Sequence, residues 1–368
     1  MAQVTLDKVN KIYGSRHGPV HAVQDLDMTV EDGEFVALLG PSGCGKTSTL
    51  RMIVGLEDIT AGTIFFDGQP VNALTPERRN VAMAFESYAL YPNFTIAENL
   101  GFPLEVRGLD AAERDREVKR IAGLLQIEHL LDQKPGQLSG GQQQRVSLGR
   151  ALIREPAAFI LDEVMSHLDA HLKFQMLFEL KRIHQRLGRT MVYVTHDQME
   201  ALALADRVAV MSNARLQQFG TRNALYHRPA NRFVADFIGE PPTNFIDVQV
   251  RSNGGDLQLT TNDGALSLTP DGDRAAALQR LSIDRLTIGL RPQSLFVEPR
   301  EDRRSLTATV ALNEYLGEMS ILTVTAGATE FRALAPPSVE AESGAPVTLH
   351  YAPGDVMLFH PETEAFID

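Results

Sequence analysis

A glycine-rich stretch near the start of the chain has the residue types and spacing of a phosphate-binding loop. Residues 40–47, GPSGCGKT, satisfy the pattern G-x-x-x-x-G-K-[ST]. The apolar run GEFVALLG ends in this loop, and KTSTLRMIVGLE continues from it with apolar residues at helical spacing. A strand, loop and helix of this kind turn successive backbone N–H groups toward phosphate oxygens. The stretch therefore predicts a site for nucleotide phosphates.

Two side chains of this loop carry the expected phosphate and metal chemistry. We expect the Lys46 ammonium group to reach the β- and γ-phosphates and the Thr47 hydroxyl to ligate Mg²⁺. Cys44 occupies a variable position of the pattern, where it either fills space or, as a thiol at a helix N-terminus, is unusually reactive. The expected nucleotide contacts from the loop and the helix start are Gly40, Pro41, Ser42, Gly43, Cys44, Gly45, Lys46, Thr47 and Ser48.

Two later apolar runs end in residues suited to hydrolysis. AAFILDE ends in adjacent carboxylates, Asp162 and Glu163; one can hold Mg²⁺ through its water shell, and the other can orient or deprotonate an attacking water. RTMVYVTHD presents His196 at the end of a predicted strand, where ligands bind in α/β sheets. We expect Glu163 to be the general base and His196 to hydrogen-bond the γ-phosphate.

A second glycine pair, in LSGGQQQR at residues 138–145, predicts another anion site. Ser139 is placed to cap a helix whose first turn carries Gly140, Gly141 and Gln142. Because the first loop already serves the phosphates, this helix start is useful mainly to a nucleotide held by another copy of the chain. The spacing alone leaves that assignment open.

Composition and charge limit the class of protein. The length of 368 residues suits two domains, each with its own core. With 35 Lys plus Arg against 47 Asp plus Glu, the net charge is -12, which argues against a general nucleic-acid binder. The single cysteine excludes an intramolecular disulfide framework and is typical of a reducing cytoplasm. No stretch approaches the roughly 20 apolar residues of a membrane-spanning helix, so we expect a soluble chain that reaches a membrane only through a partner.

Together with these motifs, LSGGQ resembles the signature loop of ATP-binding cassette (ABC) proteins, in which two copies pack head to tail around two ATP molecules. SHLDA, with Asp169, is similar to the family's loop at the dimer interface, and His196 is similar to its switch histidine. Tyr13, in NKIYG, matches the aromatic residue that stacks on adenine, with an ordinary turn aromatic as the alternative. The resemblance implies that the other copy's ATP site is completed by Ser139, Gly140, Gly141, Gln142 and Asp169.

The rest of the chain narrows the resemblance. SYALYPNFTIAENLGFPL, QQFGT and RPANRFVADFIG look most like the ATPase subunits of carbohydrate importers of the maltose and glycerol-phosphate type, which carry a C-terminal regulatory domain. After FIGEPPTNFIDV this chain changes to short alternating segments broken by Gly, Pro, Asn and Asp. These predict strands of a small barrel, with a helix only in DRAAALQRL. A small barrel could instead bind an oligonucleotide or a sugar, but few basic residues interleave with aromatics here.

The predicted fold is an α/β P-loop NTPase core with a helical subdomain, followed by an all-β OB-like regulatory barrel (TOBE domain). Residues 1–238 would form the nucleotide-binding domain, with the helical subdomain at about 90–150, and residues 239–368 would form the barrel. Residues 108–133 predict a helix with a solvated charged face. ALYPNFTIAENLGFPL, by resemblance, lines the groove for a coupling helix of a membrane subunit, and core packing explains this segment equally well.

One departure from the family pattern concerns the metal site. Glu86, in VAMAFESYALYP, stands where a glutamine usually ligates Mg²⁺ and senses the γ-phosphate. An uncompensated carboxylate about 5 Å from a phosphate charge would cost roughly 3 kcal/mol, or about a hundredfold in ATP affinity. Direct Mg²⁺ ligation, an arginine of the membrane subunit, or protonation of the carboxylate would each compensate, and we favour ligation.

A second departure lies in LDEVMSHLDAH. Val164 replaces the proline usual after the catalytic glutamate, which frees a backbone N–H and should preserve the chemistry. His167 replaces a usual asparagine, and its i,i+4 spacing from His171 is that of a zinc pair. Because no third ligand is evident, a helix start with dimer-interface packing is the better interpretation.

The resemblance implies an ATPase that powers import of a carbohydrate or related polar solute, such as a sugar, glycoside, polyol or glycerol phosphodiester, through closure and opening of a homodimer. The expected cofactors are ATP and Mg²⁺, with Thr47, Glu86 and Asp162 as metal ligands. The expected partners are two membrane-spanning permease subunits and an extracytoplasmic solute-binding protein, with no nucleic acid, and the expected location is the cytoplasmic face of the inner membrane. The alternatives are a soluble ABC ATPase acting on nucleic acid or ribosomes, and a mainly regulatory ATP-binding module.

Overall fold

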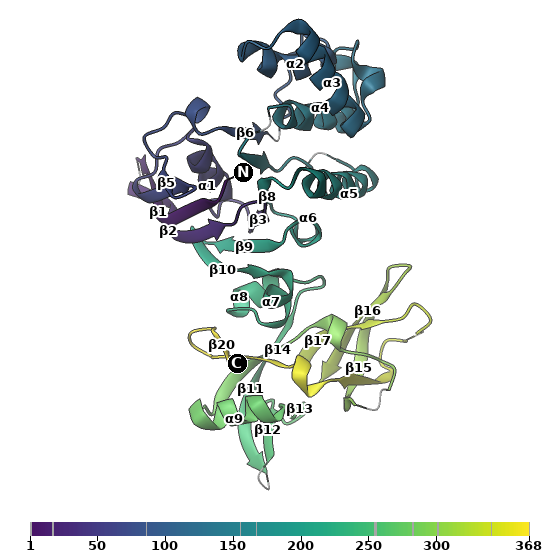
Figure 1. Cartoon of the computed structure of the whole chain (residues 1–368). Coiled ribbons are helices and arrows are strands. Elements are labelled where there is room, and N and C mark those ends of the chain that lie inside the picture. Colours follow the sequence, from purple (N-terminus) through teal and green to yellow (C-terminus); the bar gives the residue numbers. More distant parts are fainter. Residues whose placement is uncertain are drawn as a thin grey trace. The chain divides into compact units, whose positions relative to one another are not determined.

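The computed structural model describes residues 2–16, 18–85, 87–154, 156–166, 168–253, 256–281, 283–299, 302–339 and 341–367. The chain divides into two compact units, Met1–Arg222 and Asn223–Asp368 (Figure 1). This division falls before the boundary predicted near residue 239, because residues 223–238 pack with the second unit. The assignment of 1–238 and 239–368 as functional domains stays a prediction.

A six-stranded sheet forms the centre of the first unit. Its strands are β3 (Phe35–Leu39), β6 (Val81–Ala84), β7 (Ala158–Asp162), β8 (Thr190–Thr195), β9 (Arg207–Ser212) and β10 (Arg215–Thr221). The order is β10-β9-β3-β8-β7-β6, with β10 antiparallel to β9 and the other neighbours parallel. β3 and β8 are buried along their whole length, as expected for strands of a parallel sheet covered on both faces.

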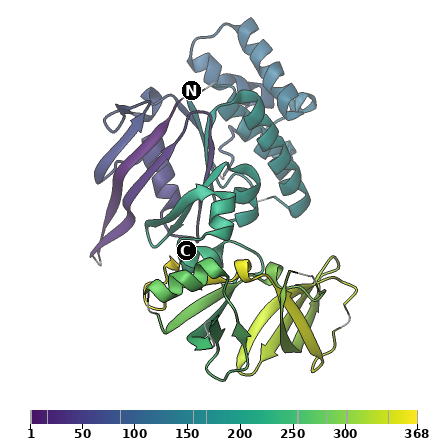
Figure 2. The same ribbon diagram turned by 60° about the horizontal axis from the view of Figure 1, so that its bottom comes forward.

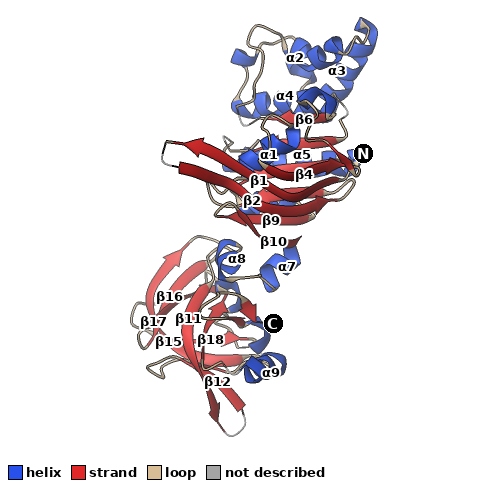
Figure 3. Cartoon of the chain, turned by 90° about the vertical axis from the view of Figure 1, so that its left-hand side faces the viewer, coloured by secondary structure: helices blue, strands red, loops and turns tan. Residues whose placement is uncertain are grey.

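A second, antiparallel sheet covers the phosphate-binding region. It has the order β2-β1-β4-β5 and comprises β1 (Val4–Ser15), β2 (Gly18–Val30), β4 (Ala61–Phe66) and β5 (Gln69–Pro70). One apolar cluster joins this sheet, helix α1 (Lys46–Val54) and the six-stranded sheet, with members such as Val23, Ile53 and Val192. Figure 3 shows β1, β2 and β4 as a layer beside α1. The helix that follows the loop is therefore anchored by apolar contacts with both sheets.

The helices of the first unit other than α1 form two groups. α2 (Ile96–Val106), α3 (Ala111–Leu125) and α4 (Gly140–Leu152) contact one another in the helical subdomain (Figures 1 and 3). α5 (Ala170–Leu187) contacts α6 (Gln198–Leu204), and α6 contacts β3 and β8. Short 3-10 turns lie at η1 (Pro76–Arg78), η2 (Glu128–Leu130) and η3 (Pro135–Gln137).

The helix predicted over residues 108–133 is shorter in the structure. Asp110 caps the start of α3 by accepting a hydrogen bond from the Glu113 N–H at 2.8 Å. The helix ends at Leu125 because Gln126 adopts a left-handed conformation with φ of 57°. Across the described residues, no helix is long and apolar enough to span a membrane.

The second unit begins with two short helices and continues as two sheets. Its strands are ordered β13-β12-β11-β14-β19-β20 and β17-β16-β15-β18. The elements are α7 (Arg222–His227), α8 (Arg232–Phe237), β11 (Asn244–Asn253), β12 (Asp256–Thr260), β13 (Ser267–Leu268), α9 (Gly272–Leu281), β14 (Arg285–Leu290), η4 (Pro292–Ser294), β15 (Arg304–Tyr315), β16 (Ser320–Ala326), β17 (Thr329–Ala335), β18 (Pro346–Tyr351), η5 (Pro353–Asp355), β19 (Met357–Phe359) and β20 (Phe366–Ile367). The all-β class and the helix predicted in DRAAALQRL are both confirmed.

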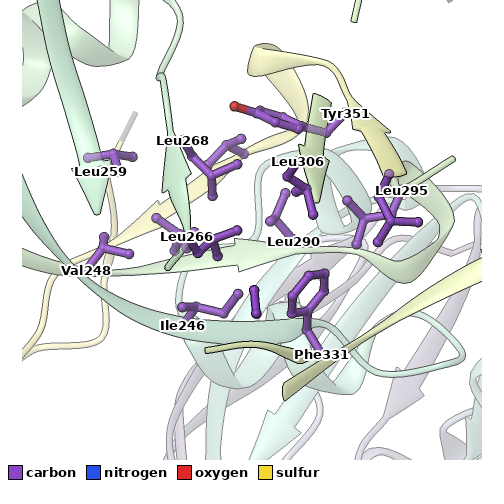
Figure 4. Packing of buried hydrophobic residues seen from close by; sticks show 14 of the residues in the cluster. Ile246, Val248, Leu259, Leu266, Leu268, Leu290, Leu295, Leu306, Phe331 and Tyr351 are labelled. Atoms are coloured by element: carbon purple, nitrogen blue, oxygen red, sulfur yellow. The ribbon is translucent and has the colours of Figure 1, made fainter. Parts of the chain in front are cut away.

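Figure 2 shows the two sheets of the second unit. Both sheets contribute side chains to one apolar core. Along β16 buried and half-buried residues alternate, so one face of this sheet points into the core. Figure 4 shows Leu290 and Leu306, from different sheets, beside Phe331 and Tyr351. Burial of these large side chains is the main stabilising contribution to the unit.

Candidate ATP-hydrolysis site

The phosphate-binding loop joins β3 to α1, as the sequence predicts. Gly43 and Gly45 have positive φ angles of 78° and 105°. A Cβ atom on Gly45 would lie 2.1 Å from the carbonyl oxygen of Ala22, and one on Gly40 would lie 2.2 Å from that of Met211. Because the backbone of neighbouring strands approaches the loop so closely, no side chain fits at Gly40 or Gly45.

Lys46, the first residue of α1, is 5% exposed. Its Nζ atom donates hydrogen bonds to the carbonyl oxygens of Gly40 at 2.8 Å and of Pro41 at 3.0 Å. Both acceptors are neutral groups of the loop itself. The ammonium charge is therefore held at the loop, where an anion would attract it more strongly than the carbonyl groups do.

Cys44 is buried between the loop and the apolar cluster of the first unit. Its burial raises the pKa of the thiol, and this effect outweighs the opposite effect of the Lys46 charge. A thiol that stays protonated is a poor nucleophile. The structure therefore favours the space-filling interpretation of Cys44 over the reactive one.

The predicted base and the predicted γ-phosphate sensor lie at the ends of neighbouring strands. β8 runs between β3 and β7, so its end lies between the strand that leads into the loop and the strand that carries Asp162. His196 Nδ1 is 3.3 Å from Glu163 Oε2, and their side chains are 54% and 22% exposed. Glu163 has a φ of 44°, which non-glycine residues rarely adopt, and its N–H donates to the Val194 carbonyl oxygen at 3.0 Å. The sequence brought both residues to this edge, but only the fold places them in contact.

Charged residues next to His196 form a network that sequence reasoning missed. Glu200, on α6, is 2% exposed and accepts a hydrogen bond from the Tyr193 hydroxyl. Lys173 Nζ, on α5, lies 2.9 Å from Glu200 and 3.0 Å from Asp197. Burial, and then the Glu200 carboxylate, raise the pKa of Tyr193 well above its usual value, so the phenol remains a donor. Asp197 and Glu200 can be read in the segment THDQME. Their partner Lys173 lies on another helix, and no local sequence pattern identifies it.

The second predicted anion site lies at the start of α4. Ser139 Oγ accepts a hydrogen bond from the Gln142 N–H at 3.4 Å, and Gln142 Oε1 accepts one from the Ser139 N–H at 2.9 Å, which confirms the predicted N-cap. Asp169 caps α5 by accepting from the Leu172 N–H at 3.0 Å. A Cβ atom on Gly141 would lie 3.2 Å from Leu172 Cδ1, so the starts of the two helices adjoin. Their contact with a second copy stays a prediction.

Tyr13 lies on β1 and contacts the helix that follows the loop. Its hydroxyl hydrogen-bonds to the Glu57 carboxylate and lies 3.1 Å from Ser48 Oγ of α1. Lys11 Nζ lies 4.8 Å from the centre of the ring. Partial burial, and then the hydrogen bond to Glu57, raise the pKa of Tyr13. The ring is thus fixed beside α1, a position compatible with the predicted stacking on adenine.

Glu86 and His167 lie outside the described residues. In the part of the chain that the structure describes, no group of three or more His, Cys, Asp or Glu side chains could hold a metal ion. His171 Nε2 lies 2.9 Å from the side-chain nitrogen of Gln175 on the same helix. Val164 is 4% exposed, so its side chain packs into the first unit.

A groove of about 460 Å³ lies beside the helical subdomain. Its lining includes Tyr91 and Val106, which are 37% and 71% exposed, together with Arg150 and Arg154. The Arg150 guanidinium lies 4.5 Å from the centre of the Tyr91 ring. Core packing alone does not account for this segment, because part of its apolar surface remains accessible.

Two family models match the chain: the ABC transporter model over residues 23–166 and the TOBE domain model over residues 288–359. The sulfoquinovosyl glycerol transport ATP-binding protein of Agrobacterium fabrum is 40% identical over 367 residues, which cover 100% of both chains. The chain belongs to the carbohydrate-importer family of ABC transporter ATPases. It therefore binds ATP and hydrolyses it.

Further relatives agree with this family membership. The sn-glycerol-3-phosphate import ATP-binding protein of Rhizobium johnstonii is 40% identical over 373 residues, covering 100% of this chain and 97% of the relative. The trehalose import ATP-binding protein of Mycobacterium tuberculosis is 45% identical over 317 residues, covering 85% and 79%. Among solved structures, a dimeric post-hydrolysis state of the ATP-binding cassette MJ0796 bound to ADP and Pi is similar, with 29% identity, a TM-score of 0.55, and coverage of 59% of this chain and 98% of that one. The ABC ATPase fold of the first unit is thus supported by structure as well as by sequence.

Proposed function

We propose that this chain powers an importer for a carbohydrate or a related polar solute, as a homodimer at the cytoplasmic face of the inner membrane. The observation that carries the proposal is the pairing of Glu163 with His196 at 3.3 Å, at the strand ends beside the phosphate-binding loop. A base and a hydrogen-bonding histidine at that edge suit hydrolysis of a bound nucleotide. Relatives that transport sulfoquinovosyl glycerol, glycerol-3-phosphate and trehalose support a sugar, glycoside or polyol derivative as the solute.

Each ATP site would be built mainly from one copy of the chain. Lys46 would exchange its carbonyl acceptors in the loop for the β- and γ-phosphates, while loop N–H groups bind the remaining oxygens. Glu163 would take a proton from the attacking water, and His196 would hydrogen-bond the γ-phosphate. Tyr13 would stack on adenine from its position beside α1.

The residues at the site fit Mg²⁺. The Thr47 hydroxyl at the start of α1 and the Asp162 carboxylate at the end of β7 are oxygen donors, and Mg²⁺ typically takes only one or two protein ligands and retains waters. When bound, the ion would offset negative charge on the phosphates. We propose Glu86 as a further ligand, and we expect Glu86→Gln to leave ATP hydrolysis within about one order of magnitude. A complete loss of activity would show that Glu86 does more than replace a glutamine.

A second copy would complete each site. Ser139 and Gly141 at the start of α4, and Asp169 at the start of α5, adjoin one another and would contact the nucleotide of the other copy. ATP would therefore favour the closed dimer, because it contacts both copies only when they meet. Hydrolysis would remove γ-phosphate contacts and let the dimer open, which would move two membrane-spanning permease subunits between inward-facing and outward-facing states.

The groove lined by Tyr91, Val106, Arg150 and Arg154 would receive a coupling helix of a permease subunit. The groove is lined by exposed apolar side chains and by arginines, a combination that suits an amphipathic helix. An extracytoplasmic solute-binding protein would deliver the solute. We expect no nucleic acid among the partners, because the net charge of the chain is -12.

Co-purification tests the transporter assignment. The full-length chain, affinity-tagged, would be isolated from mild-detergent extracts of its own membranes and its partners identified by mass spectrometry. We expect two polytopic membrane proteins and a solute-binding protein. Recovery of ribosomal or DNA-binding proteins without any membrane protein would overturn the assignment.

The dimer is tested separately with Glu163→Gln. This variant should bind ATP and accumulate as a closed dimer, because the water is no longer deprotonated while the binding contacts remain. The control is Glu163→Gln combined with Lys46→Gln, which should stay monomeric in ATP. A Glu163→Gln chain that binds ATP and remains monomeric, measured by light scattering after size exclusion, would refute the two-copy site.

A further inference from the structure

The Glu200 carboxylate is the centre of a buried polar network behind His196. It is 2% exposed, and one oxygen accepts hydrogen bonds from the hydroxyls of Tyr193 and of Thr195, the latter at 2.6 Å. Its other oxygen lies 2.9 Å from Lys173 Nζ. A buried carboxylate is tolerated only when it is paired and hydrogen-bonded in this way.

The same network fixes both neighbours of His196 in the chain. Thr195 is held by its bond to Glu200, and its Oγ1 accepts a hydrogen bond from the Asp197 N–H at 3.0 Å. Asp197 caps α6 by accepting from the Met199 N–H at 2.8 Å, and its second oxygen lies 3.0 Å from Lys173 Nζ. The backbone on each side of His196 is therefore held, while the histidine side chain remains exposed toward Glu163.

Lys173 connects this network to the helix start that carries Asp169. Its own N–H donates to the Asp169 carbonyl oxygen at 2.8 Å, in the first turn of α5. One side chain thus joins the first turn of α5, with the residue expected to face a second copy, to the segment that carries His196. Salt-bridge and hydrogen-bond networks between two elements are among the contacts that carry energetic coupling.

We propose that Lys173 and Glu200 are positioning residues that set the placement of His196 against Glu163 and couple it to Asp169 at the dimer interface. This inference rests on the proposed ATP-hydrolysis function and adds a regulation of the same site. It assigns a role in hydrolysis, distinct from nucleotide binding, to residues outside the phosphate-binding loop and the strand-end carboxylates. A movement of α5 when a second copy docks would then change the position of His196 relative to Glu163.

The first test compares Lys173→Met with Lys181→Met in the full-length chain. Lys181 is a matched control, because it lies on the same helix and pairs with a carboxylate of a following segment, Asp206, at 3.4 Å. We expect Lys173→Met to lower kcat by at least about tenfold, since small misplacements of catalytic groups are costly, with KM for ATP changed by less than about threefold. Lys181→Met should leave both constants within about twofold. Lys173→Arg should restore most of kcat, because it keeps a positive donor on the helix.

The second test asks whether Lys173 acts through His196. In a His196→Ala background, Lys173→Met should change kcat by less than about twofold if both changes disrupt one unit. Wild-type kcat in Lys173→Met, a loss that Lys181→Met reproduces, or an undiminished effect in the His196→Ala background would each overturn the proposal. If Lys173→Met does not fold, as judged by its thermal unfolding, Glu200→Gln replaces it with the same expected outcomes. Failure of the wild-type chain to hydrolyse ATP would refute the proposed function instead.

Discussion

The two compact units of this chain place their unusual features in different environments. In the first unit, Glu163 lies at the edge of a buried sheet and has a left-handed backbone conformation. Its carboxylate lies beside His196, whose side chain remains exposed. In the second unit, aliphatic side chains from two sheets form one continuous core. The first arrangement is unfavourable for stability and serves chemistry, whereas the second is favourable and serves packing.

Buried cations make the same comparison at closer range. Lys46 in the first unit donates hydrogen bonds to carbonyl groups of its own loop, which we expect nucleotide phosphates to replace. Arg291 in the second unit is 3% exposed and binds carbonyl oxygens of Tyr226 and Ile238, thereby joining α7 and α8 to the strand region. Burial lowers the pKa of Arg291 to about 10, so the group stays charged near neutral pH. The buried cation of the second unit is thus a structural clamp, whereas we expect that of the first unit to be a binding group.

The largest expected effect comes from the loop cation. Lys46→Gln should reduce ATP hydrolysis by at least about a hundredfold, because one charged donor to the phosphates is removed. The thermal midpoint of the first unit should change little, since the carbonyl acceptors that are released are neutral. The control is Lys119→Gln, an exposed residue of α3 that should leave ATP hydrolysis unchanged. An equal loss of ATP hydrolysis in Lys119→Gln would show that the effect is not specific to Lys46, and Lys46 could then not be distinguished as a binding cation.

The next effect concerns the core of the second unit. Leu349, on β18, is fully buried, and Leu349→Ala should lower the free energy of unfolding of this unit by about 2–5 kcal/mol. ATP hydrolysis by the folded chain should be retained, because the site lies in the first unit. Denaturant unfolding and ATPase assays measure the two quantities, with Leu281→Ala, at a 54% exposed position, as the control. Loss of hydrolysis in the folded Leu349→Ala protein would break the separation of roles between the units.

A smaller effect is expected where helices of the first unit meet. A Cβ atom on Gly149 of α4 would lie 2.7 Å from Leu100 Cδ2 and 3.0 Å from Leu125 Cδ1. Gly149→Ala should therefore destabilise the helical subdomain by about 1–3 kcal/mol through overpacking. Gly136→Ala is the matched control, because nothing lies within 4 Å of its added Cβ. Equal thermal midpoints for the two variants would show that α2 and α3 move aside without cost.

The smallest effect is a pH dependence of the second unit. Asp263 accepts hydrogen bonds from the Ala328 and Ala265 N–H groups and from the Thr261 hydroxyl, which lower its pKa to about 2. Because the pKa is lower in the folded state, the stabilisation is complete above the unfolded value of about 4 and is lost as the pH falls toward about 2. The urea midpoints of wild type and Asp263→Asn should differ at pH 5, and the difference should shrink as the pH falls toward 2, with Glu362→Gln as the control. A difference as large at pH 2 as at pH 5 would assign the effect to geometry instead of charge.

Sequence patterns predicted the elements whose signals are local. The loop between β3 and α1, the N-cap at Ser139 and the helix in DRAAALQRL each depend on residues close together in the chain, and the structure contains all three elements. The predicted helix over residues 108–133 was too long, because the left-handed turn at Gln126 has no strong sequence signal. The pairing of Lys173 with Glu200 was missed for a related reason, since the two residues lie on different helices and no local pattern links them.

The sequence by itself determined the chemistry of the nucleotide site. Gly43, Gly45 and Lys46 would act through backbone N–H groups and a side chain within a few residues of one another, so their spacing is sufficient to predict a phosphate site. Only the tertiary structure decided which groups meet. Strand order brings His196 to Glu163, and helix packing brings Lys173 to Glu200, because contacts between distant segments depend on how the whole sheet and its helices pack.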